Sequence, residues 1–179
     1  AFAQAGEGGK IVVVGPDRVD FGRYPSVEKK TATYKIRNDG DSVLKILGIR
    51  KSCACAEAKC SRNSIKPGKT ATIEVVILSN SIFGPYSKNN FVESSDPLNR
   101  LLKLNVAGYA VPLVEVTPSM SFNAGRIPLN TPWNGDFLLK PTQSGVVLGE
   151  IQSNGMHGLT GRLSRGVAAK DVILEVLRI

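Results

Sequence analysis

Apolar and polar residues alternate along three separate segments, and this alternation limits the possible folds more than any other feature of the sequence. Ala32, Tyr34 and Ile36 alternate with threonine, lysine and arginine residues. The same alternation recurs in residues 71–77 and 101–106. A period of two puts one apolar face on a β-strand, and no window shows the 3.6-residue period of a long helix. The pattern predicts an all-β protein made of half-buried strands.

Turn sequences separate these segments. Asn38-Asp39-Gly40-Asp41 predicts a hairpin. Pro67-Gly68 suits a type II turn, in which glycine adopts a positive φ. Asp96-Pro97 is a further break. Short strands with a turn every ten or so residues are typical of a β-sandwich or barrel.

Short sequence elements recur about 100 residues apart. Residues 14–16 (Val-Gly-Pro) return as residues 116–118 (Val-Thr-Pro), and residues 22–25 return as residues 125–128. Such a spacing matches the length of one immunoglobulin-like domain.

The repeat extends into the predicted strands. At an offset of 103, Tyr34 falls on Phe137, which also lies on an inward face. The sequence therefore predicts two tandem immunoglobulin-like β-sandwiches, residues 11–111 and residues 113–179, joined near Pro112.

The second predicted sandwich lacks the counterparts of roughly residues 80–111. An open sandwich would expose the inward faces of Val172, Leu174 and Val176 and leave strand edges unpaired. Two alternatives follow. Either the native chain continues beyond Ile179, or the open edge is covered by the first domain or by a second chain, giving a homodimer through strand addition.

The first ten residues carry information on location. Ala1-Phe2-Ala3-Gln4-Ala5 resembles the small-residue end of a secretory signal peptide, and Gly6–Gly9 suits a flexible lead-in. The alternative is an arbitrary cut in a longer chain. We favour the signal remnant and expect an exported protein, periplasmic or at the cell surface. No apolar run reaches the ~18 residues of a membrane-spanning helix, so no span is expected.

The net charge of +8 requires an explanation in terms of partners. The 23 Lys and Arg are scattered, and the longest run is Lys29-Lys30. Aromatic residues make up 6% of the chain, which leaves few platforms for base stacking. These features argue against a nucleic-acid partner and fit attraction to an anionic envelope polymer or lipid better.

Five elements in order carry a resemblance to a known family. They are Val19-Asp20-Phe21-Gly22, Tyr34–Gly40, Leu44–Ile49, Ser52-Cys53-Ala54-Cys55 and Ile65–Lys69. Across about residues 11–111 the chain resembles a bacterial family of unknown function, whose members are envelope-associated immunoglobulin-like modules similar in fold to hydin-type and major-sperm-protein domains. That family usually has Gly at the position of Ala54 and often Thr at that of Ala56. The resemblance implies a β-sandwich in an envelope setting and no established activity.

The cysteines Cys53, Cys55 and Cys60 are the candidate site residues. On a strand, Cys53 and Cys55 would share a face and could chelate a soft metal such as Cu(I) or Zn. A third ligand would have to come from Cys60, Met120, Met156 or His157. In an exported protein a disulfide is expected instead. Since a bond within Cys-x-Cys is small and strained, we expect Cys60 to pair with Cys53 or Cys55 and one thiol to stay free. Reduced structural thiols are a third alternative.

Catalytic motifs are missing from the sequence. There is no G-x-S-x-G, no H-E-x-x-H and no phosphate-binding glycine loop, and the single histidine, His157, lies between glycines in a loop sequence. We therefore expect no enzyme and no cofactor. The expected function is a non-catalytic structural or protein-interaction module of the bacterial cell envelope, with an unidentified protein or envelope component as its partner. The alternative is a thiol-based metal-binding or redox protein that uses Cys53 and Cys55.

Overall fold

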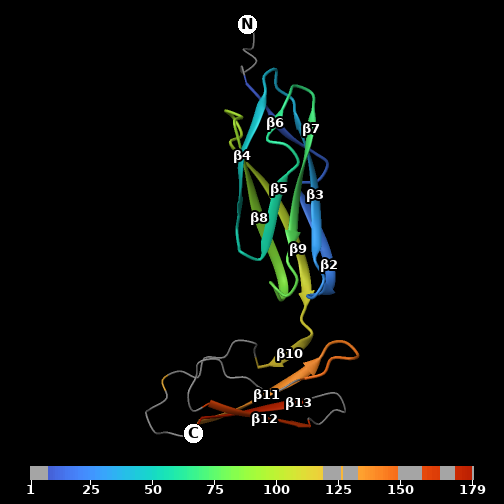
Figure 1. Cartoon of the computed structure of the whole chain (residues 1–179), viewed down its shortest axis with the longest axis vertical. Helices are drawn as coiled ribbons and strands as arrows, with labels where there is room; N and C mark the ends of the chain where they lie inside the picture. Colours follow the sequence, from blue (N-terminus) through green and yellow to red (C-terminus); the bar gives the residue numbers. More distant parts are fainter. Residues whose placement is uncertain (1–7, 119–125, 127–132, 149–158, 166–171, 179) are drawn as a thin grey trace. The chain divides into compact units, whose positions relative to one another are not determined.

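The computed structural model describes residues 8–118, 126, 133–148, 159–165 and 172–178 (Figure 1). The chain divides into two compact units, Ala1–Val111 and Pro112–Ile179. Every regular element in the described ranges is a β-strand, which confirms the all-β prediction. No helix in the described part of the chain is long and apolar enough to cross a membrane.

Unit 1 contains two β-sheets. The first sheet is antiparallel, with strands in the order β1-β3-β7-β5. Its strands are β1 (Ile11–Val14), β3 (Lys30–Asn38), β7 (Thr70–Ile77) and β5 (Ala56–Cys60). The second sheet has the order β2-β9-β8-β4-β6, and its β2–β9 pair is parallel. Its strands are β2 (Arg18–Pro25), β9 (Leu101–Val111), β8 (Gly84–Ser94), β4 (Leu44–Lys51) and β6 (Ser64–Ile65).

The core of unit 1 lies between the inward faces of these sheets. Tyr34, Ile36 and Ile73 are buried in the first sheet, and Leu104 and Val106 are buried in the second. All five lie on the apolar faces that the period-two pattern predicted, and this prediction is confirmed. Burial of such side chains stabilises the fold by roughly 1.5–3 kcal/mol each.

The predicted hairpin at residues 38–41 is wrong. Asn38 ends β3 in the first sheet, whereas the next strand, β4, belongs to the second sheet. The buried Asn38 side chain stabilises this passage of the chain from the first sheet to the second, because it forms hydrogen bonds with four backbone groups. Its Nδ2 donates to the carbonyls of Ser42 and Ile65, both at 2.8 Å, and its Oδ1 accepts from the amides of Lys10 and Gly40, both at 3.0 Å.

Two other turn predictions agree with the structure. Gly68 has a φ of 70°, and the Lys69 amide donates to the Lys66 carbonyl at 3.0 Å, as in a β-turn. Asp96-Pro97 lies in the connection between β8 and β9. Both turns place glycine or proline where the chain reverses.

The described part of unit 2 is one antiparallel sheet with the strand order β10-β11-β13-β12. Its strands are β10 (Val114–Thr117), β11 (Trp133–Pro141), β13 (Val172–Arg178) and β12 (Leu159–Arg165). Phe137 lies on β11, the second strand in this order, as Tyr34 lies on β3, the second strand of the first sheet of unit 1.

Candidate functional site

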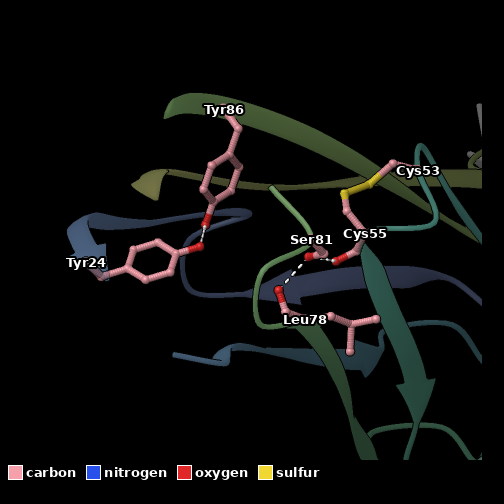
Figure 2. The surroundings of a disulfide bond; sticks show 6 residues. All are labelled: Tyr24, Cys53, Cys55, Leu78, Ser81 and Tyr86. Atoms are coloured by element: carbon pink, nitrogen blue, oxygen red, sulfur yellow. Dashed lines mark hydrogen bonds between the residues drawn. A yellow bond between two sulfur atoms is a disulfide. The ribbon is translucent and has the colours of Figure 1, made fainter. Parts of the chain in front are cut away.

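Cys53 and Cys55 lie in the turn that connects β4 to β5 (Figure 2). Because β4 and β5 belong to different sheets, this turn carries the chain across the sandwich. The two sulfurs form a disulfide, and the Cα atoms are 5.2 Å apart. That separation is within the usual range for a disulfide. Both cysteines are partly exposed.

The predicted disulfide to Cys60 is wrong. β5 is extended from Ala56 to Cys60, and each residue of a strand advances about 3.3 Å, which puts Cys60 roughly 16 Å from Cys55. A disulfide needs Cα atoms within about 7 Å. Cys60 is a free thiol, and its sulfur donates to the Arg62 carbonyl at 3.0 Å. The expectation of one unpaired thiol is confirmed.

The cysteines also differ from the geometry expected for metal binding. Cys53 and Cys55 lie in a turn, not on one strand, and both are oxidised in the disulfide, so neither offers a thiolate to a metal ion. Within the described ranges, no group of three or more His, Cys, Asp or Glu side chains is placed to hold a metal ion. Met120, Met156 and His157 lie outside the described residues. Metal binding at this turn would therefore require reduction of the disulfide.

Hydrogen bonds from the loop between β7 and β8 hold the disulfide turn (Figure 2). The Cys55 carbonyl accepts from the Leu78 amide at 3.0 Å and from Ser81 Oγ at 3.1 Å. Ser81 Oγ also contacts the Leu78 carbonyl. These bonds involve backbone and hydroxyl groups only, so the position of the turn does not depend on the sulfur–sulfur bond alone.

Two buried tyrosines, one from β2 and one from β8, meet in the same region (Figure 2). The hydroxyls of Tyr24 and Tyr86 are 2.8 Å apart, and their rings pack edge to face. Burial, followed by the hydrogen bond to Tyr24, raises the pKa of Tyr86 above its usual range. The pair links the edge strand β2 to the central strand β8 of the second sheet and contributes to its packing.

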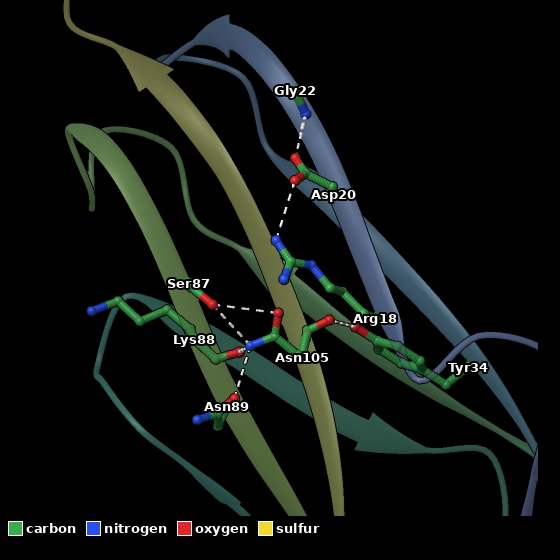
Figure 3. Close-up of polar contacts among 8 residues, drawn as sticks. All are labelled: Arg18, Asp20, Gly22, Tyr34, Ser87, Lys88, Asn89 and Asn105. Atoms are coloured by element: carbon green, nitrogen blue, oxygen red, sulfur yellow. Dashed lines mark hydrogen bonds and ion pairs between the residues drawn. The ribbon is translucent and has the colours of Figure 1, made fainter.

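Polar contacts link Asn105 of β9 to β8 and to Tyr34 of β3, and a separate set lies within β2 (Figure 3). Asn105 Nδ2 donates to Asn89 Oδ1 at 2.8 Å and to Ser87 Oγ at 3.0 Å. The Asn105 carbonyl accepts from the Tyr34 hydroxyl, and burial raises the pKa of Tyr34 to about 12. On β2, Arg18 forms an ion pair with Asp20 at 3.5 Å. These partners satisfy one another and support the sheet.

The second sheet also carries a groove of about 530 Å³. Its lining residues are Leu47, Arg50, Glu93, Ser94, Ser95, Arg100 and Leu101. Leu47 is 65% exposed and Leu101 is 51% exposed, unusual values for leucines on neighbouring parts of one sheet. Two apolar walls therefore face solvent there.

A β-bulge explains the exposure of Leu47. In the β4–β8 ladder Ile46 pairs with Ser94 and Gly48 pairs with Glu93, which leaves Leu47 as the extra residue. A bulge re-aims the side chain at the point where the register shifts. On the other side of β8, Glu93 pairs with Leu101 of β9, so Glu93 separates the two leucines.

Charged groups line the same groove. Arg50 Nε pairs with Glu93 Oε1, while the Arg50 side chain is 72% exposed. Arg100 is exposed and adds a second cation. Unit 1 holds 17 of the 23 Lys and Arg and 10 of the 15 Asp and Glu, a net charge of +7. The groove thus combines apolar walls with a cationic surrounding.

Sequence reasoning had not singled out this groove, although a signal for it exists. Leu44 and Ile46 are two residues apart and both point into the core, but the next core residue on β4 is Ile49, three residues later. This change of parity marks an inserted residue. It indicates the bulge at Leu47.

The family model of proteins of unknown function DUF1573 matches residues 12–110. The chain belongs to the DUF1573 family. The DUF1573 match covers unit 1 almost completely and confirms the predicted resemblance to a family of unknown function; the envelope setting stays a prediction. A search of the curated proteins finds no match.

The DUF1573 domain is similar to several solved structures. A protein of unknown function from Porphyromonas gingivalis W83 has a TM-score of 0.53 and 19% identity, over 60% of this chain and 49% of that chain. This chain therefore spans about half the length of that protein. The PapD-like domain 7 of human CEP192 has a TM-score of 0.45 and 13% identity, over 57% of this chain and 86% of that chain. WR4, a C. elegans member of the MSP family, has a TM-score of 0.39 and 12% identity, over 57% and 97%.

Proposed function

We propose that this chain is a non-catalytic protein-interaction module of the bacterial cell envelope, and that it binds an extended segment of a partner protein in the groove between Leu47 and Leu101. The observation that carries the proposal is the exposure of these two leucines on opposite sides of Glu93. Exposed apolar patches of this kind on a soluble domain are typical of interaction sites.

The chemistry of the groove selects the partner segment. The two leucines favour aliphatic side chains, and Arg50 and Arg100 favour carboxylates. The net charge of +7 on unit 1 adds long-range attraction for an acidic segment. The expected ligand is therefore a peptide in which aliphatic and acidic residues alternate.

We also propose that unit 2 is a second immunoglobulin-like domain. The register of its sheet supports this. Val13 pairs with Ile36 in unit 1, and Val116 pairs with Leu139 in unit 2, both shifted by 103 residues. Tyr34 pairs with Ile73, and its counterpart Phe137 pairs with Leu174, which lies 101 residues after Ile73. The strand orders β1-β3-β7-β5 and β10-β11-β13-β12 correspond one to one.

This register moves one detail of the predicted repeat. The aligned residues are Val13 and Val116, whereas the Val-Gly-Pro and Val-Thr-Pro motifs align Val14 with Val116.

A tandem pair of domains would present two copies of one sheet within a single chain. Tandem modules gain affinity when both engage a partner.

The disulfide supports the envelope location. Disulfides persist in oxidising compartments such as the periplasm and the cell surface and are rare in the cytosol. Fractionation of cells that produce the native protein tests the location directly: recovery with the periplasmic or surface fraction is expected, and recovery in the cytosol would contradict it.

A peptide-display selection on the purified chain tests the groove. We expect enrichment of peptides that combine aliphatic and acidic residues, and a loss of affinity of at least tenfold in Leu47→Ser and in Leu101→Ser. Val27→Ser is the matched control, because Val27 is a comparably exposed apolar residue that does not line the groove. Its affinity should equal that of the wild type.

Other outcomes of the selection decide against the proposal. No enrichment, or enriched peptides whose affinity is the same for the wild type and both leucine variants, would refute binding in the groove. Self-association of the wild type that Leu47→Ser abolishes, measured by analytical ultracentrifugation, would instead identify a second copy of this chain as the occupant.

A further inference from the structure

We propose that the Cys53–Cys55 disulfide is a thiol–disulfide exchange site that accepts two electrons from a dithiol while unit 1 stays folded. This inference uses residues that do not line the groove, so it stands or falls independently of the proposed binding function. The substrate class is a protein or small-molecule dithiol.

The Cys53–Cys55 disulfide contributes little to the stability of the fold because of its position in the chain. It encloses a single residue, Ala54. The constraint that a disulfide places on the unfolded chain grows with the number of residues it encloses, and here that number is close to the minimum. A bond between such close neighbours therefore does little to hold distant parts of the fold together.

The strands on both sides of the turn are fixed without the bridge. Lys51, at the end of β4, pairs with Asn90 of β8, and Ala56, at the start of β5, pairs with Ile77 of β7. Between them, the Cys55 carbonyl accepts hydrogen bonds from the Leu78 amide and Ser81 Oγ (Figure 2). Reduction removes none of these contacts.

These strand pairings and hydrogen bonds also keep the two thiols close after reduction. Their Cα atoms are 5.2 Å apart within a turn whose ends cannot separate. An acceptor disulfide takes the two electrons back by the same exchange: one thiolate of the pair forms a mixed disulfide with it, and the other cysteine, already in position at a high effective concentration, closes the Cys53–Cys55 bond and releases the acceptor as a dithiol. The pair can then alternate between disulfide and dithiol in a preformed turn.

Access and charge suit the reaction. Both cysteines are partly exposed, and Lys51 lies two residues before Cys53. The attacking species in thiol–disulfide exchange is a thiolate, and an electropositive surrounding favours both its approach and the thiolate that leaves. Glu57, two residues after Cys55, balances Lys51 locally, so the attraction for an approaching thiolate comes from the net charge of +7 on unit 1 as a whole.

The step proceeds through a mixed disulfide. A thiolate of the dithiol attacks one sulfur of the Cys53–Cys55 bond, forms a new sulfur–sulfur bond and releases the other cysteine as a thiolate, which takes up a proton. The second thiol of the dithiol, deprotonated in turn, attacks the mixed disulfide and releases the second cysteine. The dithiol becomes a disulfide, and the protein gains two electrons and two protons.

Cys60 takes no part in this cycle. It lies at the far end of β5, where its sulfur donates to the Arg62 carbonyl. Its Sγ is therefore not placed to attack a mixed disulfide at the turn. This separation gives the experiment an internal reference thiol.

A redox titration of the purified full chain tests the proposal. The protein is equilibrated with defined ratios of oxidised to reduced dithiothreitol, its thiols are alkylated, and peptide mapping by mass spectrometry reports each cysteine. We expect Cys53 and Cys55 to convert together, with a midpoint at which oxidised dithiothreitol exceeds the reduced form at least tenfold. The far-UV circular dichroism spectrum should not change across the titration.

Three results would overturn the proposal. They are a midpoint at which reduced dithiothreitol is in excess, reduction that occurs only together with loss of the β-sheet spectrum, and free Cys53 and Cys55 thiols in the protein as isolated. Cys60→Ser is the matched control and should give the same midpoint. The double variant Cys53→Ser, Cys55→Ser should keep the wild-type spectrum; its unfolding would show that the bond is a structural requirement and would also refute the inference.

Discussion

Replacing Asn38 with alanine tests whether one buried amide organises the turn-rich end of unit 1. The Asn38 side chain is fully buried and forms four hydrogen bonds, with the backbone groups of Lys10, Gly40, Ser42 and Ile65. Alanine leaves all four groups without these partners. A hydrogen bond contributes about 1 kcal/mol net, so the four together contribute about 4 kcal/mol.

Part of this loss is recoverable, because water can reach some of the turn groups once the side chain is gone. We therefore expect Asn38→Ala to lower the stability of unit 1 by about 2–4 kcal/mol. That range corresponds to a decrease of about 30- to 1,000-fold in the protection of amides that exchange only through opening of the first sheet.

Hydrogen exchange followed by mass spectrometry is the suitable assay, because it reads β3 and β7 separately from unit 2. A single unfolding midpoint would mix the two units. Asn63→Ala is the matched control, since Asn63 is exposed. Protection in Asn38→Ala within threefold of that in Asn63→Ala would refute the role assigned to the buried amide.

Three further predictions concern packing and titration. Gly9→Ala should destabilise unit 1 by about 1–3 kcal/mol, because the new Cβ would lie 2.6 Å from Leu44 Cα; an unchanged calorimetric transition would contradict this. The pKa of Tyr34 is about 12 in the folded protein and about 10 when unfolded, so its contribution to stability is complete below pH ~10 and is lost as the pH rises through 12. Tyr34→Phe should reduce the alkaline decline in the urea midpoint of unit 1 between pH 9 and 12, and an equal decline in both proteins would disprove the cause. Tyr86→Phe leaves the Tyr24 hydroxyl without its 2.8 Å partner and should cost about 1 kcal/mol, read as a lower melting temperature of unit 1.

The features predicted correctly from the sequence are those that local patterns determine. Tyr34, Ile36 and Ile73 are buried because a strand alternates its side chains, and that alternation is visible in the sequence itself. The turn at position 68 requires a positive φ, and glycine in the sequence indicates this because few other residues tolerate that conformation.

The features that were missed depend on distant parts of the chain. A turn sequence such as residues 38–41 does not reveal whether the next strand joins the same sheet, because the main partner of β4 is β8, whose paired residues lie 39 to 48 positions later. The disulfide was misassigned for a related reason. Spacing alone made Cys60 a plausible partner, but the extended conformation of β5, imposed by its pairing with β7, carries Cys60 away.

The parallel pairing of β2 with β9 has a consequence for synthesis of the chain. β2 ends at Pro25, and its partner β9 ends at Val111, whose carbonyl also accepts a hydrogen bond from the Ser26 amide at 2.8 Å. A ribosome adds about 5–20 residues per second, so β2 remains without its partner for roughly 4–17 s after it is made. During that interval an early strand is open to pairing with other chains, so a nascent unit 1 needs either shielding of β2 or slow release until Val111 has emerged.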